Sequence, residues 1–269
     1  MPPAVQAAIL GVVQGITEFL PVSSTAHLLI AERLLGYRDP GGVFTVMIQL
    51  GSIFAVVWLY RVKVLDVLTG LTTRNDARQF AFKIILASLP ALVIGGLFSK
   101  YIRSVIYGTF MVIAVTFTVG GIIMLIVEAF RPKPDVFTVD EMPTGRAFNV
   151  GIFQALALIP GVSRSGGTIV AAMAMKVDRP AAAEFTFFLA MPTMAAAFAH
   201  DLFGARHELA SARGVEVAVG FVFAFLSSLL VVKPFLDYVR RSGFQAFAWY
   251  RIVAGVALFA AIYGAGWGR

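Results

Sequence analysis

The chain has 269 residues, of which 59% are hydrophobic and only 14% are charged, and its mean hydropathy is +0.84. Soluble domains carry roughly 25% charged residues, so this composition excludes an ordinary soluble protein and indicates a membrane protein. The formal net charge of +7 does not indicate nucleic-acid binding, because the basic residues fall in short segments between apolar stretches, as topology signals do. The sequence has no cysteine, which excludes disulfides and thiolate metal sites.

Six apolar stretches are long enough to cross a hydrocarbon core of about 30 Å. They run near Phe44–Tyr60, Phe82–Phe98, Phe110–Val127, Ala182–Phe203, Val215–Val232 and Phe247–Ala265. Two further apolar regions, Val5–Gly36 and Phe148–Met175, are each divided by a polar, proline-containing break into arms too short to cross alone. Such backbone is tolerated at membrane depth where protein or a wet cavity satisfies it, so we predict two re-entrant helix–turn–helix pairs.

The two breaks belong to an internal repeat. Leu20–Thr25 resembles Ile159–Ser165, with Ser23 matched to Ser163. A later Phe-Thr pair that begins at Phe44 recurs at Phe185, at nearly the same spacing along the chain. Because both pairs of matching segments are separated by nearly the same number of residues, we predict that the chain consists of two half-repeats. We therefore expect residues 1–130 to form the first half, residues 131–145 a cytoplasmic connector, and residues 146–269 the second half.

Each half would contain one re-entrant pair and three spans, and this odd number of crossings would invert the second half. The predicted fold class is therefore an all-α polytopic membrane protein built from two inverted-topology repeats. On this topology thirteen basic residues lie on one side of the membrane and seven on the other, which places the first side in the cytoplasm. Both chain ends would lie outside.

Polar and ionisable side chains gather at the two breaks. Charged groups at membrane depth cost roughly 2.5–3.5 kcal/mol each on insertion scales, which makes them functional candidates. The first break carries Glu18 and His27, with Gln14 one helical turn before Glu18, and the second break carries Arg164. Hydroxyl and glycine residues accompany them, namely Ser23, Ser24, Thr25, Gly161, Ser163, Ser165, Gly166 and Thr168.

These residue types suit a phosphate ester or anhydride. Helix starts and arginine bind phosphate oxygens, while His27 can act as nucleophile or acid–base and Glu18 can orient it or bind a divalent cation. Simpler interpretations stand beside these. Glu18 and Arg164 could form an ion pair that fixes the register of the halves, and His27 could be a hydrogen-bonded interfacial histidine. Glu184 and Arg251 lie near span ends, where we expect them to reach the membrane surface.

At the two breaks the sequence resembles the undecaprenyl-diphosphate phosphatase family, which is also known for bacitracin resistance. The matching motifs are QGITEFLPVSSTAHL (Gln14–Leu28) and PGVSRSGGT (Pro160–Thr168), and the flanking hydropathy fits over nearly the whole chain. The resemblance implies that the protein removes the terminal phosphate of undecaprenyl diphosphate and depends on a divalent cation, Mg²⁺ or Ca²⁺. It also implies a site in the bacterial inner membrane that faces the outer side and recycles the lipid carrier for the cell envelope.

The resemblance also implies roles for individual residues. Catalytic roles fall on Glu18, Ser24, His27 and Arg164, and substrate binding falls on Gln14, Ser23, Thr25, Gly161, Ser163, Ser165, Gly166 and Thr168. Gln14 stands where other members carry Glu, so Glu18 is the single carboxylate left in that motif for a metal ion. The nucleophile stays open between His27, a serine and water. The small-residue spans are compatible with a homodimer.

Two other functional classes compete with this interpretation. A lipid-phosphate or anion transporter is the main alternative, because inverted repeats with broken helices are typical of that class. A carrier, however, does not require the Glu18/His27 pair for bond cleavage. The acid-phosphatase-like lipid phosphatases are disfavoured, because no His-x₃-Asp motif follows Ser163-Arg164.

Overall fold

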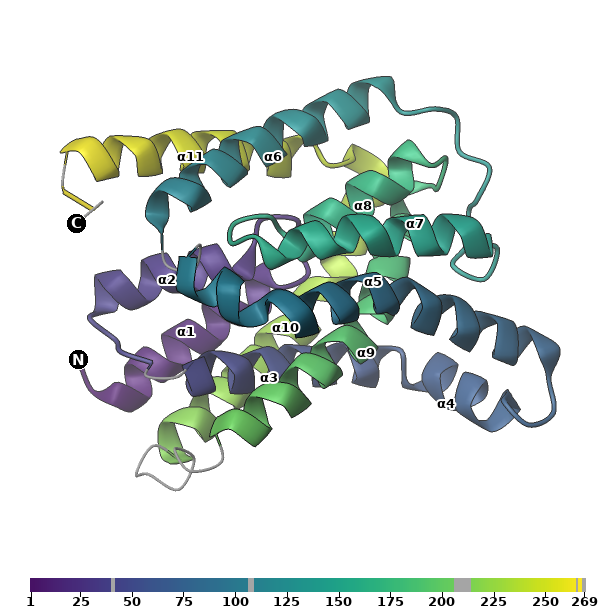
Figure 1. Cartoon of the computed structure of the whole chain (residues 1–269), viewed down its shortest axis with the longest axis horizontal. Coiled ribbons are helices and arrows are strands. Elements are labelled where there is room, and N and C mark those ends of the chain that lie inside the picture. Colours follow the sequence, from purple (N-terminus) through teal and green to yellow (C-terminus); the bar gives the residue numbers. More distant parts are fainter. Residues whose placement is uncertain (40–41, 106–108, 206–213, 265, 268–269) are drawn as a thin grey trace.

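The computed structural model of the chain is helical throughout most of its length (Figure 1). It describes residues 1–39, 42–105, 109–205, 214–264 and 266–267. The first half comprises α1 (Pro3–Thr17), α2 (Ser24–Leu35), α3 (Val43–Leu59), α4 (Arg61–Gly70), α5 (Asn75–Val105) and α6 (Phe110–Phe130). The second half comprises α7 (Thr144–Gln154), the 3₁₀ helix η2 (Ala155–Leu158), α8 (Arg164–Ala174), α9 (Arg179–Ala205), α10 (Gly214–Ser242) and α11 (Gln245–Gly264).

The long apolar helices confirm a polytopic membrane protein. In the described part of the chain, five helices are long and apolar enough to cross a membrane, namely α5, α6, α9, α10 and α11. The bent pair formed by α3 and α4 makes a sixth candidate, with an angle of 75° between the two helices. The predicted span Phe44–Tyr60 therefore corresponds to α3, whose 17 residues are about 26 Å long at the usual helical rise.

The segment that follows α3 is helical, although it lies between two predicted spans where no helix was predicted. α4 turns away from α3 and exposes Val62, Leu65 and Leu68, which recur at helical spacing, while Arg61 and Lys63 supply charge. A short helix with these properties suits the boundary between lipid and water rather than a crossing. Hydropathy averaged over a long window does not separate such a helix from a loop.

Both predicted breaks are present, and they lie between antiparallel helix pairs that enter from opposite ends. α1 and α2 enter from the end of the molecule that carries both termini, whereas α7 and α8 enter from the end that carries α4 (Figure 1). Pro21 and Pro160 cannot donate a backbone hydrogen bond, which interrupts each helix at this depth. The two turns therefore face each other near the middle of the molecule, as the inverted repeat predicts.

The two halves pack against each other rather than forming separate lobes. α1 lies along α10, α7 lies along α5, and α6 lies along α11. Gly11 in α1 and Gly151 in α7, which are equivalent positions of the repeat, allow the first two of these contacts. A Cβ atom on Gly11 would collide with the carbonyl oxygen of Gly220, and one on Gly151 would collide with that of Ala87. The same close approach thus recurs in both halves.

The connector after α6 is anchored to the second re-entrant pair. Val136 forms an isolated parallel bridge with Val177, and the Asp178 N–H donates to the Val136 carbonyl at 2.8 Å. Val139 and Met142 are buried. This connector therefore contributes to the core, whereas the boundaries of the two repeats stay a prediction.

The two ends of the molecule match the two sides on which the basic residues were counted. The termini lie at one end, and α4 and the α6–α7 connector lie at the other (Figure 1). Arg206, Arg213 and Arg269, which were counted on the side of the termini, lie outside the described residues. The assignment of one end to the cytoplasm stays a prediction.

Candidate active site

The turns between the paired helices meet and are joined by hydrogen bonds. We call residues 18–24 the first tip and residues 158–164 the second tip. The Ser165 hydroxyl, in the first turn of α8, donates to the Leu20 carbonyl at 2.8 Å. Phe19 packs edge-on against Phe187 of α9, with 5.3 Å between ring centroids. Polar bonds and aromatic packing therefore hold the first tip against the second half.

The backbone at both tips adopts uncommon conformations. Ser23, the residue before α2, has φ of 68°, which is unusual for a residue with a side chain. Gly161 has φ of 85°, and a Cβ atom at this position would also collide with the Thr116 hydroxyl. Glycine is the residue that tolerates both conditions. The substrate-binding role of Gly161 stays a prediction.

Arg251 of α11 ties the two tips together. Only 2% of this residue is exposed. Its guanidinium donates to the carbonyls of Pro21 at 3.2 Å, Gly161 at 3.1 Å and Thr116 at 2.9 Å. The expectation that Arg251 reaches the membrane surface is therefore wrong, because the residue is buried and its donors satisfy the Pro21 and Gly161 carbonyls at the two breaks. Glu184 is partly buried and accepts a hydrogen bond from the Tyr60 hydroxyl at 3.1 Å.

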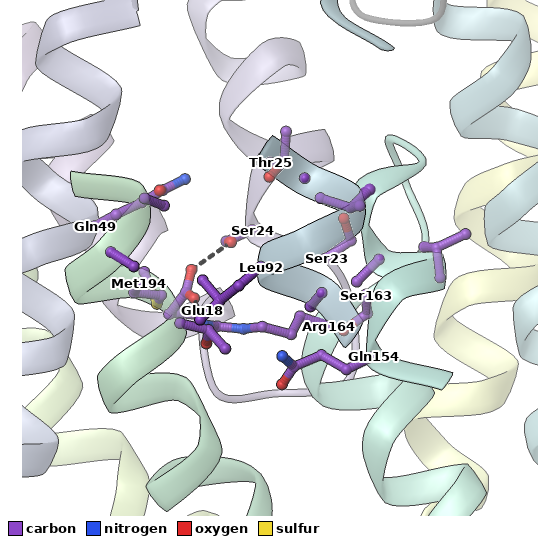
Figure 2. A pocket seen from close by; sticks show the side chains of 18 of the residues that line it. Glu18, Ser23, Ser24, Thr25, Gln49, Leu92, Gln154, Ser163, Arg164 and Met194 are labelled. Atoms are coloured by element: carbon purple, nitrogen blue, oxygen red, sulfur yellow. Dashed lines mark hydrogen bonds and ion pairs between the residues drawn. The ribbon is translucent and has the colours of Figure 1, made fainter. Parts of the chain in front are cut away.

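A carboxylate, a hydroxyl and a guanidinium meet where the tips touch (Figure 2). Glu18 Oε2 accepts hydrogen bonds from Gln14 Nε2 at 2.7 Å and from Ser24 Oγ at 2.5 Å. Glu18 Oε1 forms an ion pair with the Arg164 guanidinium of the other half. The ion pair between the halves, weighed above as a structural alternative, is therefore present. Its two members also line a cavity, so structural and chemical roles are compatible.

The cavity beside this group has a volume of about 500 Å³ and a polar end formed by the tips. That end is lined by Glu18, Ser23, Ser24, Thr25, Ser163 and Arg164. α2 and α8 both begin here, and helix N-termini favour anions. Most of the remaining wall is apolar and rich in small residues from α5, η2 and α9, including Gly95, Ala157 and Ala196. This arrangement suits an anionic group attached to an apolar chain.

Several predicted substrate-binding residues lie behind this surface rather than on it. Gln14, Gly161, Ser165, Gly166 and Thr168 do not line the cavity. The Gly166 N–H donates to Ser163 Oγ at 3.0 Å, which makes Ser163 the cap of α8. Thr168 donates to the Arg164 carbonyl at 2.7 Å and accepts from Thr186 at 2.9 Å. These contacts support the second tip from within the protein, and direct substrate binding by these residues stays a prediction.

His27 lies on a different face of α2 from the cavity. Its Nδ1 lies 2.8 Å from the Ser23 carbonyl oxygen, and its Nε2 lies 2.6 Å from the Tyr250 hydroxyl. The imidazole stacks on the Tyr250 ring, with 5.7 Å between ring centroids and 13° between the planes. His27 does not line the cavity and contacts the first tip through Ser23. Its catalytic role stays a prediction.

Other residues at the cavity were not singled out from the sequence. Gln49 of α3, Gln154 of α7 and Thr193 of α9 all line it. The sequence does contain a signal for Gln154, because it follows Gln14 at the same spacing that relates Ser163 to Ser23. Hydropathy alone could not reveal Gln49 or Thr193, because a single polar residue does not disturb an apolar span.

The residues at the tips do not fit a metal ion held by protein ligands alone. Glu18, the predicted metal ligand, already accepts bonds from Gln14 and Ser24 on one oxygen and from Arg164 on the other. Among the described residues, no group of three or more His, Asp or Glu side chains could hold an ion. Gln14 adds no charge where a second carboxylate would be needed.

Comparison with known proteins agrees with this geometry. The family model described as bacitracin resistance protein BacA matches residues 7–257, a range that includes both tips. The chain belongs to the BacA family. Its relatives include the undecaprenyl-diphosphatase 1 of Agrobacterium fabrum, 47% identical over 93% of this chain and 94% of the relative. The undecaprenyl-diphosphatase of Cereibacter sphaeroides is 46% identical (95% of this chain, 96% of the relative), and that of Paracoccus denitrificans is 44% identical (97% of each). BacA membership confirms the resemblance recognised from the two motifs.

Proposed function

We propose that this chain is an undecaprenyl-diphosphate phosphatase, which releases inorganic phosphate and leaves the lipid monophosphate. The observation that carries the proposal is the meeting of Glu18, Ser24 and Arg164, contributed by both halves, at the polar end of a cavity with an apolar wall. The names of the BacA relatives support the substrate. A transporter is not favoured, because a carrier needs no hydroxyl bonded to a carboxylate.

The diphosphate binds at the two tips and the prenyl chain lies along the apolar wall. The Arg164 guanidinium matches phosphate oxygens through two parallel N–H groups, and the first N–H groups of α2 and α8 add partial positive charge. The chain passes beside the small residues of α5, η2 and α9, which leave room for it. Substrate therefore enters sideways from the bilayer, with its charged end at the cavity.

Ser24 acts as the nucleophile, with Glu18 as its base. Ser24 Oγ lies 2.5 Å from Glu18 Oε2 and faces the cavity, whereas both ring nitrogens of His27 are engaged elsewhere. Oγ attacks the terminal phosphorus, Glu18 takes its proton, and the bond from that phosphorus to the bridging oxygen breaks. The lipid monophosphate leaves with the bridging oxygen. Glu18 passes the first proton to the departing bridging oxygen and is again a carboxylate. Water then attacks the phosphoserine and gives a proton to Glu18, the bond from phosphorus to Ser24 Oγ breaks, Glu18 returns the proton to that oxygen, and inorganic phosphate is released.

A divalent cation enters this proposal as part of the substrate rather than as a resident cofactor. Mg²⁺ commonly binds phosphate oxygens together with one or two carboxylates and several waters. Phosphate release should therefore fall in the presence of a chelator and return when Mg²⁺ or Ca²⁺ is added. We further propose that the protein resides in the bacterial inner membrane with its site accessible from the outer side, on the basis of the uneven distribution of basic residues.

The test is phosphate release by the purified full-length protein from a polyprenyl diphosphate in detergent. Wild type should release phosphate, and Ser24→Ala should lose about ten-thousand-fold in turnover, as expected when a nucleophile is removed. Acid quenching with substrate labelled in its terminal phosphate should leave label on Ser24, since phosphoserine survives acid and phosphohistidine does not. Near-normal turnover by Ser24→Ala, or acid-labile label on His27, would reject Ser24 as the nucleophile. A folded wild type without release under several cations would reject the activity.

A further inference from the structure

Gln154 is a buried polar residue that the proposed chemistry leaves unused. It is the last residue of α7, and only 2% of it is exposed. Neither its side-chain nitrogen nor its side-chain oxygen has a hydrogen-bond partner among the described residues. Its side chain nevertheless lines the cavity that Glu18 and Arg164 share. A buried amide without partners is costly, so this position calls for a physical explanation.

The internal repeat explains how the amide came to be unpaired. Gln154 is the repeat equivalent of Gln14, just as Arg164 is the equivalent of Ser24. In the first half, the Gln14 amide donates to Glu18, one turn later in the chain, at 2.7 Å. The position that corresponds to Glu18 in the second half is Leu158, whose side chain cannot accept a hydrogen bond. The second half thus keeps the glutamine but lacks its partner.

The surroundings indicate what kind of ligand the amide faces. In Figure 2 the Arg164 side chain runs between the Glu18–Ser24 pair and Gln154. A group placed at this end of the cavity therefore meets the Ser24 hydroxyl on one side of Arg164 and the Gln154 amide on the other. An amide offers two N–H donors, and an oxygen-rich anion that binds arginine can accept them.

On the basis of the proposed function, we propose that Gln154 binds the inner phosphate of the lipid diphosphate, the one that stays on the lipid after hydrolysis. The terminal phosphate lies at Ser24, where it is attacked, and Arg164 contacts both phosphates. Gln154 then contributes to binding of the lipid diphosphate. It also contributes to binding of the lipid product but not of inorganic phosphate.

The variant Gln154→Met keeps a similar volume and removes both hydrogen-bonding groups. In the full-length protein, kcat/KM for the polyprenyl diphosphate should fall about tenfold, mainly through KM. Inhibition by lipid monophosphate should weaken by a similar factor, and inhibition by inorganic phosphate should stay unchanged. The thermal unfolding temperature should stay equal or rise, because the wild-type amide makes no hydrogen bond within the described protein.

Gln6 provides a matched control with the opposite expectation. Its side-chain nitrogen donates to the Leu35 carbonyl at 2.7 Å, away from the cavity. Gln6→Met should therefore lower the unfolding temperature and leave KM and both inhibition constants unchanged. If Gln154→Met behaves like Gln6→Met, or leaves inhibition by lipid monophosphate unchanged, the inference is overturned. If wild type releases no phosphate, the proposed function fails. Gln154 can then be tested by thermal unfolding, because lipid monophosphate should raise the unfolding temperature of wild type more than that of Gln154→Met.

Discussion

The two tips share one scaffold and differ in the side chains that they carry. Each is a proline-containing turn between short helices, and each places a helix start at the same cavity. At equivalent positions the first half has Glu18 and Ser24, and the second half has Leu158 and Arg164. The carboxylate and hydroxyl therefore come from one half and the cation from the other.

Neither half therefore contains a complete site. Two identical tips would place like charges opposite each other, or no charge at all. Divergence of the repeat gives complementary charges across the junction, and the bond between Glu18 and Arg164 is a direct result.

Arg164→Ala removes the whole cationic contribution of the second tip. It should lower kcat/KM about a thousandfold, because a guanidinium that neutralises the diphosphate is lost and Glu18 keeps no counter-charge. Arg164→Lys should recover only part of this loss, since an ammonium group cannot form the two parallel bonds. Phosphate release from a polyprenyl diphosphate measures both variants. Turnover close to wild type in Arg164→Ala would refute the role given to the arginine.

Arg251→Met tests whether the two tips must be held in register. It removes hydrogen bonds to carbonyls of both tips and of α6, so the unfolding free energy should fall by about 2–4 kcal/mol. The kcat should fall about tenfold while KM changes little. Backbone amide exchange should become faster in both tips, as measured by mass spectrometry. Arg61→Met, at an exposed arginine of α4, is the control; equal exchange at the tips in both variants would argue against the role of Arg251.

Gln14→Glu places a second carboxylate beside the first tip. The Gln14 amide lies 2.7 Å from Glu18 in the wild type, so the new carboxylate would face Glu18 directly. Phosphate release should then need a lower Mg²⁺ concentration for half its maximum rate, and it should be weaker than wild type when Mg²⁺ is scarce, because two carboxylates repel each other. A Mg²⁺ titration measures this. An unchanged titration curve would mean that the cation does not approach this position.

Asp135→Asn alters the connector and should have the smallest effect. Asp135 pairs with Arg146 at an exposed position, and this pairing lowers the pKa of Asp135 below its usual value. Any stabilisation is therefore present at neutral pH and is lost as the pH falls through that lowered pKa, and exposed pairs contribute little. Phosphate release and unfolding temperature at neutral pH should match wild type. A large loss of activity would show that the connector takes part in the chemistry.

Much of the fold could be predicted from the sequence. Long apolar stretches identified the spans, and Pro21 and Pro160 marked the breaks because their effect on a helix is local. α4 was missed because its alternation of charged and apolar residues is short. The re-entrant pairs were recognised because arms of this length cannot cross a membrane alone.

The site was predicted only in part, for a physical reason. Glu18, Ser24 and Arg164 stand in short motifs beside the breaks, so their neighbourhood follows from the local sequence. The direction of His27 depends on how α2 packs against α11, and the burial of Arg251 depends on how α11 packs against α6. Such rotations about a helix axis are set by partners distant in the chain. A single sequence does not reveal them.

The pairing of helices between the halves has a consequence for biogenesis. α1, α5 and α6 find their principal partners in α10, α7 and α11, which are translated later. When the first half leaves the ribosome, α10, which packs against Gly11, and Arg164, which pairs with Glu18, have not yet been made. The nascent chain therefore reaches the bilayer as an assembly intermediate whose most polar turn is unshielded. A ribosome that stops after α6 would leave a fragment suited to recognition by membrane proteases.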